Sequence, residues 1–254
     1  TCNFGQDSSF AGTETAQGNA DGNGIGDFYY APPSGFLALC TANLPDPVAT
    51  IDPAKGGSPQ DYFNTVLYTG NGSTQGITGA GFQPDFTWIK RQNDTNYHNL
   101  YDSVRGVTKW MESNTATAEQ TGANRLTAFN SDGFSVGSDH PVNQNTGLYT
   151  AWNWRAGTAF SNDASSTSVG NVDSAGSVNT DVGFSIIAKT NTGNDNQTVA
   201  HGLGVAPDLI IIKNKSVAGS WVIGYNTAGF NWANDYIQFD TGGEKGDGSG
   251  TVFG

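Results

Sequence analysis

The chain has 254 residues, a formal net charge of −12 and a sequence pI near 4.3. This acidity argues against nucleic acid as a partner, because phosphate groups are repelled by an acidic surface. No run of about 20 apolar residues is present, so we predict no membrane span. Glycine accounts for 35 residues and charged residues for only 13% of the chain, which favours short strands joined by tight turns over long helices. We therefore predict an all-β protein.

The N-terminal segment, residues 1–44, contains two strand-like pieces at 2–6 and 34–40. Between them lies a Gly/Asp/Asn-rich stretch at 18–27. Because 44 residues of this kind are too few to fold alone, we predict the C-terminal part of an upstream domain, and a chain that is a segment of a larger polypeptide. Residues 45–60 carry several prolines and are predicted to form an extended linker.

The sharpest local motif lies in the Gly/Asp/Asn-rich stretch. Oxygen-bearing side chains stand at positions 1, 3, 5 and 9 of a loop, as Asn19, Asp21, Asn23 and Asp27, with glycine at position 6. This spacing is typical of the first part of a calcium loop, in which a tight turn directs oxygens at a hard cation. The bidentate glutamate expected at position 12 is replaced by Tyr30. The alternative is a hairpin loop whose Asn and Asp side chains bond to their own backbone. Calcium is the one cofactor that we consider.

Cysteines and histidines are few. Cys2 and Cys40 either form a disulfide or remain two buried free thiols, and the low cysteine content favours thiols. His98, His140 and His201 have no metal-ligand spacing, so we predict structural or surface roles for them.

A long phrase occurs twice in the chain. GAGFQPDFTWIK at 79–90 returns as GLGVAPDLIIIK at 202–213, which is 123 positions later. Solenoid units recur at about 20–50 residues, so this spacing indicates a duplicated domain. We predict a first β-sandwich repeat at 61–158 and a truncated second repeat at 183–254, joined by a Ser/Gly/Asn-rich linker at 159–182.

Apolar runs mark the strands of the first repeat. Residues 104–122 are predicted to form a connecting segment with one helical turn. Leu209–Ile212 has the sequence pattern most typical of a buried strand in this chain. Phe86, Trp88 and Ile89 occupy both faces of one run, which predicts a strand covered on both sides. The expected strands are 63–69, 85–91, 97–103, 125–129, 133–137 and 147–155.

Four stretches resemble a β domain that is repeated in large virion proteins of tailed phages, many of them marine or cyanobacterial. They are GFQPDFTWIK at 81–90, LYDSVRG at 100–106, NSDGFSVG at 130–137 and YTAWNWRAG at 149–157. Residues 3–6 and 30–45 resemble the end of a SPRY-like (concanavalin-like) domain. The resemblance implies tandem concanavalin- or jelly-roll-like β-sandwich domains in a tail fibre or related virion protein. It also implies a homo-oligomer, with a trimer as the expected form, and contacts with other virion proteins. It implies no ligand residues. The predicted second repeat has a different sequence at the position of the Asp-Ser-Val-Arg-Gly segment, which contains Arg105 in the first repeat.

Enzymatic motifs are weak. No nucleophile elbow, phosphate-cradling glycine loop or Cys/His pair is present. Asp85 and Asp208 each follow proline, where they favour a turn and a strand start. A glycosidase needs two suitably spaced carboxylates, and the glutamates lie in polar, turn-like surroundings: Glu14, Glu112, Glu119 and Glu244. We predict that the chain is not an enzyme.

Aromatic residues keep a binding role open. Trp152 and Trp154 lie two positions apart and so share a sheet face, as a core wall or as a sugar platform, with the core favoured. Tyr29, Tyr30 and Trp232 are the aromatic residues expected to be exposed. We predict a structural component of a phage virion, most simply a tail fibre that also recognises host-surface glycans. The alternatives are a carbohydrate-binding module of a secreted or surface protein and a depolymerase fragment.

Overall fold

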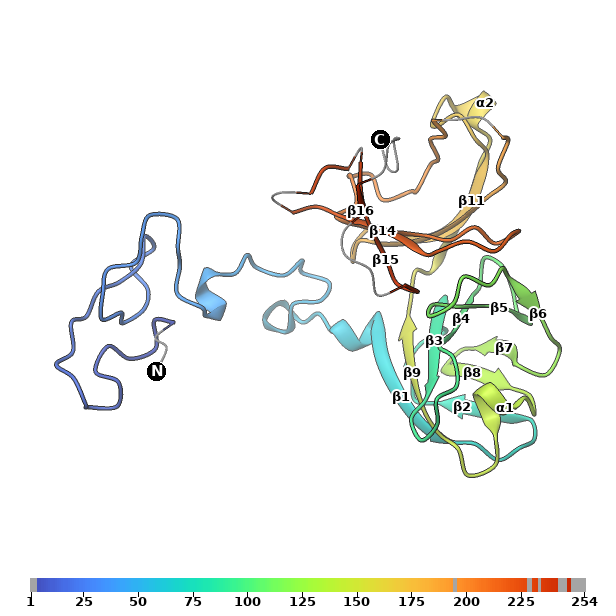
Figure 1. Cartoon of the computed structure of the whole chain (residues 1–254), viewed down its shortest axis with the longest axis horizontal. Helices are drawn as coiled ribbons and strands as arrows, with labels where there is room; N and C mark the ends of the chain where they lie inside the picture. Colours follow the sequence, from blue (N-terminus) through green and yellow to red (C-terminus); the bar gives the residue numbers. More distant parts are fainter. Residues whose placement is uncertain (1–3, 194–195, 228–229, 233, 242–245, 248–254) are drawn as a thin grey trace. The chain divides into compact units, whose positions relative to one another are not determined.

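A computed structural model of the chain describes residues 4–193, 196–227, 230–232, 234–241 and 246–247 (Figure 1). It divides into two compact units, Thr1–Val48 and Ala49–Gly254. The predicted all-β class is confirmed, because four antiparallel sheets account for most of the regular structure of the described residues, and the helices are of three or four residues. Within those residues, no helix has the length and apolar character needed to cross a bilayer.

The first unit is built from turns. Its regular elements are one antiparallel bridge, between Asn19 and Phe28, and a short 3₁₀ helix η1, Thr41–Asn43. The strands predicted at 2–6 and 34–40 are wrong for the described residues. Local bonds satisfy their backbone instead, as in the N–H of Ala38, which donates to a carboxylate oxygen of Asp21. The boundary of the unit falls within the predicted linker, which also carries 3₁₀ helices η2, Pro53–Lys55, and η3, Pro59–Asp61.

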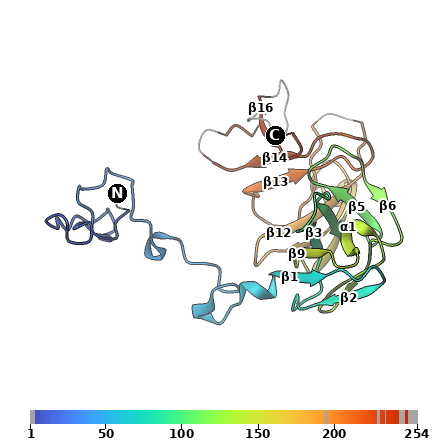
Figure 2. The same cartoon turned by 60° about the horizontal axis from the view of Figure 1, so that its bottom comes forward.

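The second unit contains a six-stranded sheet packed on a three-stranded sheet (Figures 1 and 2). Ile89, Tyr101, Phe134 and Tyr149 are fully buried between them. The larger sheet has the order β1 (Phe63–Thr69), β9 (Leu148–Trp154), β3 (Phe86–Arg91), β4 (Asn99–Asp102), β5 (Lys109–Glu112), β6 (Gln120–Thr121). The smaller has the order β2 (Gln75–Thr78), β8 (Gly133–Val136), β7 (Leu126–Asn130).

All six strands predicted for the first repeat are confirmed. Alternating and doubly apolar runs located them, because each strand packs on the core with one or both of its faces. The helical turn predicted within 104–122 is wrong, since this segment contains β5 and β6. A short helix, α1 (His140–Asn143), lies instead between β8 and β9.

The segment predicted as a Ser/Gly/Asn-rich linker is ordered. It contains β10 (Thr158–Asn162), a short helix α2 (Ala164–Thr167) and β11 (Ser174–Asn179). These strands form a three-stranded sheet with β12 (Phe184–Lys189). Small residues at β11 let the strands approach closely, as at Gly176, where a Cβ atom would lie 2.3 Å from the carbonyl oxygen of Ile186. The proposed domain boundaries themselves stay a prediction.

A fourth sheet has the order β13 (Leu209–Ile212), β14 (Val222–Tyr225), β15 (Asp235–Gln238), β16 (Gly246–Asp247). Its pairing repeats that of β3 to β6. Phe86 pairs with Asp102 and Leu209 with Tyr225, so both partners are displaced by the same 123 residues. Below, residues 61–158 are called the first copy and residues 183–254 the second copy.

The burial predicted for Leu209–Ile212 is wrong. Leu209, Ile211 and Ile212 are 58%, 44% and 44% exposed, whereas Ile89, the counterpart of Ile212, is fully buried. The strand assignment itself is correct. Its apolar run reproduces that of β3, but the described residues supply no second sheet over it.

Candidate functional site

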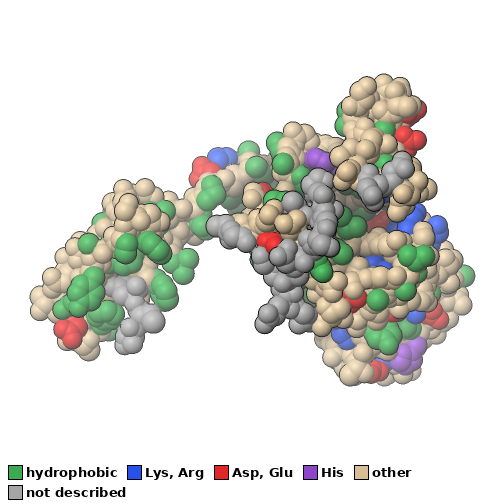
Figure 3. All heavy atoms as spheres, turned by 45° about the horizontal axis from the view of Figure 1, so that its top comes forward, with side chains coloured by type: hydrophobic (Ala, Val, Ile, Leu, Met, Phe, Trp, Pro, Cys, Tyr) green, Lys and Arg blue, Asp and Glu red, His purple; other side chains and the backbone are tan. Residues whose placement is uncertain are grey.

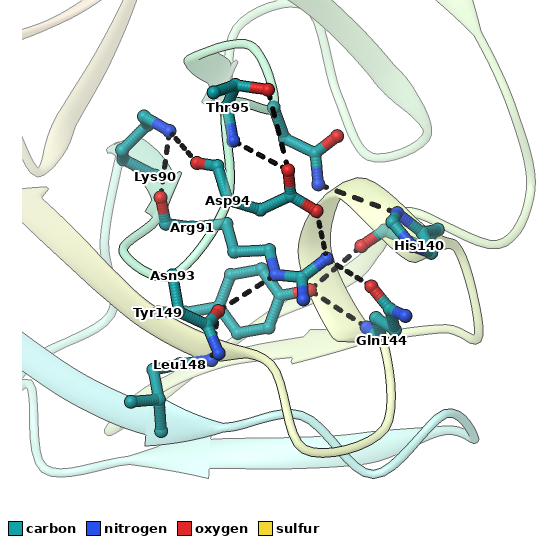
Figure 4. A network of polar contacts seen from close by, with 10 residues as sticks. Lys90, Arg91, Asn93, Asp94, Thr95, His140, Gln144, Leu148 and Tyr149 are labelled. Atoms are coloured by element: carbon teal, nitrogen blue, oxygen red, sulfur yellow. Dashed lines mark hydrogen bonds and ion pairs between the residues drawn. The ribbon is translucent and has the colours of Figure 1, made fainter.

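The loop between β3 and β4, residues 92–98, is held in a defined conformation by Arg91 (Figure 4). Arg91 ends β3 and is 8% exposed. Its guanidinium donates to Asp94 Oδ2 at 2.8 Å, to Asn93 Oδ1 at 3.0 Å and to Gln144 Oε1. Lys90 Nζ caps the same loop by donating to the carbonyl oxygen of Asp94 at 2.9 Å. A half-buried ion pair of this kind orders the loop more than an exposed pair would.

Tyr149 connects this loop to helix α1. Its hydroxyl donates to the carbonyl oxygen of His140 at 2.8 Å and accepts the N–H of Gln144 at 2.9 Å. Burial raises the pKa of Tyr149, so the hydroxyl keeps its proton. Figure 4 shows the Arg91 and Tyr149 groups side by side between the loop and the helix. The two groups fix the backbone from which the outer side chains project.

The outward face of this loop is polar with one aromatic residue. Tyr97 is 53% exposed, and Gln92, Thr95 and His140 are also exposed. Amides, hydroxyls and an exposed phenol ring are the groups that hydrogen-bond to and stack on sugars. The pattern was not singled out from the sequence. The available signal was a run of Asn, Asp and Thr that ends in a tyrosine directly after a buried strand.

A second polar cluster is structural. Arg105 and Asp102 form an ion pair, and both side chains are 6% exposed. Arg105 also donates to Glu119 Oε2 at 3.2 Å and to the carbonyl oxygen of Leu100 at 3.0 Å. Each nitrogen of this guanidinium therefore has an acceptor, on Asp102 and Leu100 of β4 and on Glu119 directly before β6. Glu112, predicted in turn-like surroundings, instead ends strand β5 and is buried, so that prediction is wrong for this residue.

The four residues of the predicted calcium loop are engaged in hydrogen bonds. Asp21 accepts the N–H groups of Ala38, Asn23 and Ile25, and the N–H of Ala38 above all lowers its pKa to about 2. Such bonding matches the hairpin alternative given above.

The remaining members of the loop bond separately. Asp27 Oδ2 accepts the N–H of Ser8 at 3.1 Å, and the amide of Asn19 donates to the carbonyl oxygen of Phe28. Asn23 Nδ2 donates to the side chain of Asn43. No group of three or more His, Cys, Asp or Glu side chains among the described residues is arranged to hold a metal. Calcium stays a prediction.

The cysteines and histidines lie in separate places. Cys40 is half-buried, and Cys2 lies outside the described residues, so their pairing stays a prediction. His98 Nδ1 accepts the indole N–H of Trp88 at 2.9 Å, and burial lowers the pKa of His98. His201 Nδ1 accepts the N–H of Leu203 at 3.2 Å.

Trp152 and Trp154 belong to an aromatic layer between the copies. Trp154 stacks on Phe184 of the second copy, with ring centroids 6.4 Å apart. Trp152 packs edge-on against Trp88, which in turn contacts Phe239. Both tryptophans are half-buried, as the core interpretation expects.

The aromatic residues of the first unit are more exposed. Tyr30 is 80% exposed, as predicted, but the prediction is wrong for Tyr29, which is half-buried because its ring packs against that of Tyr30. Figure 3 shows hydrophobic side chains gathered on the surface of this unit. A groove of about 330 Å³ is lined there by Phe4, Phe28, Tyr30, Ala31, Pro32, Pro33, Phe36 and Leu37. Trp232, predicted to be exposed, is half-buried.

Comparison with known families gives one match. A family described as a domain of unknown function (DUF7483) matches residues 58–253. The chain belongs to this family. The match spans both copies of the repeated phrase. No curated protein and no solved structure matches the chain.

Proposed function

We propose that the chain is a structural component of a phage virion, most simply of a tail fibre, built from copies of one β module. The observation that carries the proposal is the recurrence of strand pairing. The β3–β4 and β13–β14 pairs have the same register at a displacement of 123 residues. Tandem copies of a rigid module extend a protein without new chemistry, which is what a fibre requires. The phage assignment rests on the resemblance of the sequence to the β domain that is repeated in virion proteins of tailed phages.

Hydrogen bonds between the two copies support the proposed role as a rigid structural component. The indole N–H of Trp221, which is buried, donates to the carbonyl oxygen of Glu112 at 2.7 Å. The N–H of Glu119 donates to the carbonyl oxygen of Lys215 at 2.9 Å. A third bond joins the N–H of Gly219 to the carbonyl oxygen of Ala116 at 2.8 Å. Backbone bonds of this kind resist sliding of one copy over the other.

Host recognition, as the second part of the proposal, would use the exposed loop at 92–98. Its backbone is fixed by Arg91, and its outward groups suit sugar hydroxyls. A fixed loop loses little conformational entropy on binding. The groove of the first unit is the competing surface, and it favours the alternative of a carbohydrate-binding module through its exposed aromatic rings.

The test is the oligomeric state of the protein, measured by light scattering with and without a calcium chelator. A stable trimer or larger assembly supports the fibre proposal. Dissociation or a lower melting temperature with chelator would assign calcium to Asn19, Asp21, Asn23 and Asp27. A monomer indifferent to calcium would contradict the proposal.

Retention on a glycan array then separates the two recognition surfaces. Tyr97→Ala abolishes retention if the loop at 92–98 binds glycan, while Tyr30→Ala is the matched variant in the groove. Retention lost only with Tyr30→Ala would favour the carbohydrate-binding module.

A further inference from the structure

The loop that follows the repeated phrase has the same length in both copies. Ile89 of β3 pairs with Asn99 of β4, and Ile212 of β13 pairs with Val222 of β14. Both members of the second pair lie 123 residues after those of the first, so residues 90–98 and 213–221 correspond one to one. The two loops can therefore be compared residue by residue.

The second loop lacks the groups that hold the first loop in place. The counterpart of Arg91, whose guanidinium donates to Asp94 Oδ2 at 2.8 Å, is Asn214. The counterpart of Asp94 is Val217, so these two positions of the second loop cannot form an ion pair. Asn214 Oδ1 instead accepts the N–H of Ser216 at 2.9 Å. The hydrogen bonds that fix the first loop are therefore not reproduced in the second.

The second loop contacts the first copy instead. Lys90 Nζ caps its own loop, as described above. Its counterpart, Lys213, donates to the carbonyl oxygen of Ala116 in the first copy at 3.2 Å. The counterpart of His98 is Trp221, which is buried and donates its indole N–H to the first copy. The second loop therefore joins the two copies.

The aromatic residue of the first loop has no aromatic counterpart. Tyr97 is 53% exposed, and the residue that corresponds to it is Ser220, which is half-buried. Thr95, which is also exposed, corresponds to Ala218. An exposed phenol ring offers an apolar face to a pyranose ring, and a hydroxyl exchanges hydrogen bonds with those of a sugar. At these two positions the groups suited to a sugar belong to the first loop alone.

The charged side chains of the first loop are paired with groups of the protein. Arg91 and Asp94 form an ion pair of 2.8 Å. Lys90 Nζ donates to the carbonyl oxygens of Arg91 and Asp94 at 2.8 and 2.9 Å. Figure 4 shows these groups turned toward the loop backbone and helix α1. The side chains that the loop exposes besides Asp94 are therefore chiefly uncharged amides, hydroxyls and the ring of Tyr97.

The neighbouring helix α1 adds one imidazole to this surface. Asp139, directly before the helix, pairs with Arg125 at 3.2 Å. His140 is exposed, and its Nδ1 lies 3.5 Å from Nδ2 of Asn96 in the loop. A neutral imidazole exchanges hydrogen bonds with sugar hydroxyls as amides do. The loop and the start of the helix together present a polar surface whose carboxylates and guanidinium groups are paired.

We propose that the loop at 92–98 of the first copy alone binds glycan and that its ligand is a neutral hexose polymer, an inference that rests on the host recognition proposed above. An acidic glycan would be repelled by a chain of net charge −12, and the cations of the loop are already paired. A neutral sugar meets no such repulsion. Its hydroxyls and its apolar ring face match the amides, hydroxyls and phenol ring of the loop.

Retention of the complete chain on a glycan array tests the assignment, with Tyr97→Ser as the variant that introduces the residue of the second loop. We expect retention on glucans, galactans or mannans, weakened about tenfold or more by Tyr97→Ser. The urea midpoint of this variant should stay unchanged, because the ring is exposed. Ser220→Tyr is the reciprocal variant and should add no retention. Tyr30→Ser is the matched control, because it removes another exposed tyrosine outside the loop.

Salt concentration separates neutral from acidic ligands. Retention on the neutral glycans should change less than about twofold between about 0.1 M and about 1 M salt, because salt screens interactions between charges. Retention mainly on acidic glycans, with a strong loss in salt, would overturn the inference. Retention that Tyr97→Ser leaves intact, or that Tyr30→Ser abolishes, would also overturn it, although host recognition itself would survive. Failure of the native chain to bind any glycan would instead contradict host recognition, and the inference with it.

Discussion

Ile89 and Ile212 occupy equivalent positions of the repeat and differ mainly in exposure, so they form a matched pair for mutation to alanine. Ile89 is fully buried between the two sheets of the first copy, and Ile212 is 44% exposed. Ile89→Ala removes three carbon atoms and leaves a cavity, with an expected loss of about 3–4 kcal/mol in the free energy of unfolding. Ile212→Ala removes the same atoms from a site that is about half solvated. The expected loss in the free energy of unfolding is therefore about 1 kcal/mol, roughly half of the free energy gained by burying these atoms fully. No cavity adds to it, because solvent fills the space.

Urea denaturation followed by tryptophan fluorescence measures both variants. We expect a difference of about 2 kcal/mol or more between them, with unchanged denaturant slopes. If the copies unfold in separate transitions, each variant should shift the transition of its own copy. An equal cost for Ile212→Ala and Ile89→Ala would refute the reasoning, because it would mean that β13 is covered in solution as β3 is.

Three other predictions concern single side chains. Trp221→Phe removes the buried indole donor between the copies and should cost about 1–2 kcal/mol in unfolding free energy; an unchanged urea midpoint would contradict that contact. Arg105→Met leaves the buried carboxylate of Asp102 without its ion-pair partner and should cost about 3–5 kcal/mol, measured in the same assay; a loss below about 1 kcal/mol would show that the pair is solvated. The pKa of Asp21 is about 2 in the folded chain, below its usual value near 3.9. The stability that this carboxylate contributes is therefore present above about pH 4 and lost as the pH falls toward 2. The protection factor of the Ala38 amide, which is its exchange relative to an unprotected amide at the same pH, should fall in that window, and Asp21→Asn should remove this pH dependence. An unchanged profile in Asp21→Asn would contradict the assignment.

Local patterns in the sequence predicted the first copy well. Alternating and doubly apolar runs identified its six expected strands, because each strand is buried on one face or, as in β4, on both. Strands β5 and β6 were missed. Lys109–Glu112 mixes charged and apolar residues, and its Glu112 is buried at a position where local pattern favours a turn. Gln120–Thr121 carries no apolar signal at all.

Whether a strand is buried depends on residues that are distant in the sequence, and the local sequence pattern does not show these. The run Leu209–Ile212 is more apolar than Phe86–Arg91, and propensity alone makes it the better core strand. Its exposure arises because the described part of the chain supplies neither a second sheet over it nor a strand on its outer edge. Likewise, the loop at 92–98 has an ordinary polar composition. Its fixed conformation depends on Arg91, Gln144 and Tyr149, which meet only after β3 and β9 have paired.

Hydrogen–deuterium exchange of the unliganded chain compares the two copies most directly. Every interior amide of β3 should be protected, because β4 and β9 pair with its two edges. In β13 every second amide should exchange rapidly, since among the residues that the structure describes only the edge facing β14 is paired. Alternating protection in Leu209–Ile212 is the result expected of a strand at the edge of its sheet. Uniform protection equal to that of Phe86–Arg91 would contradict it.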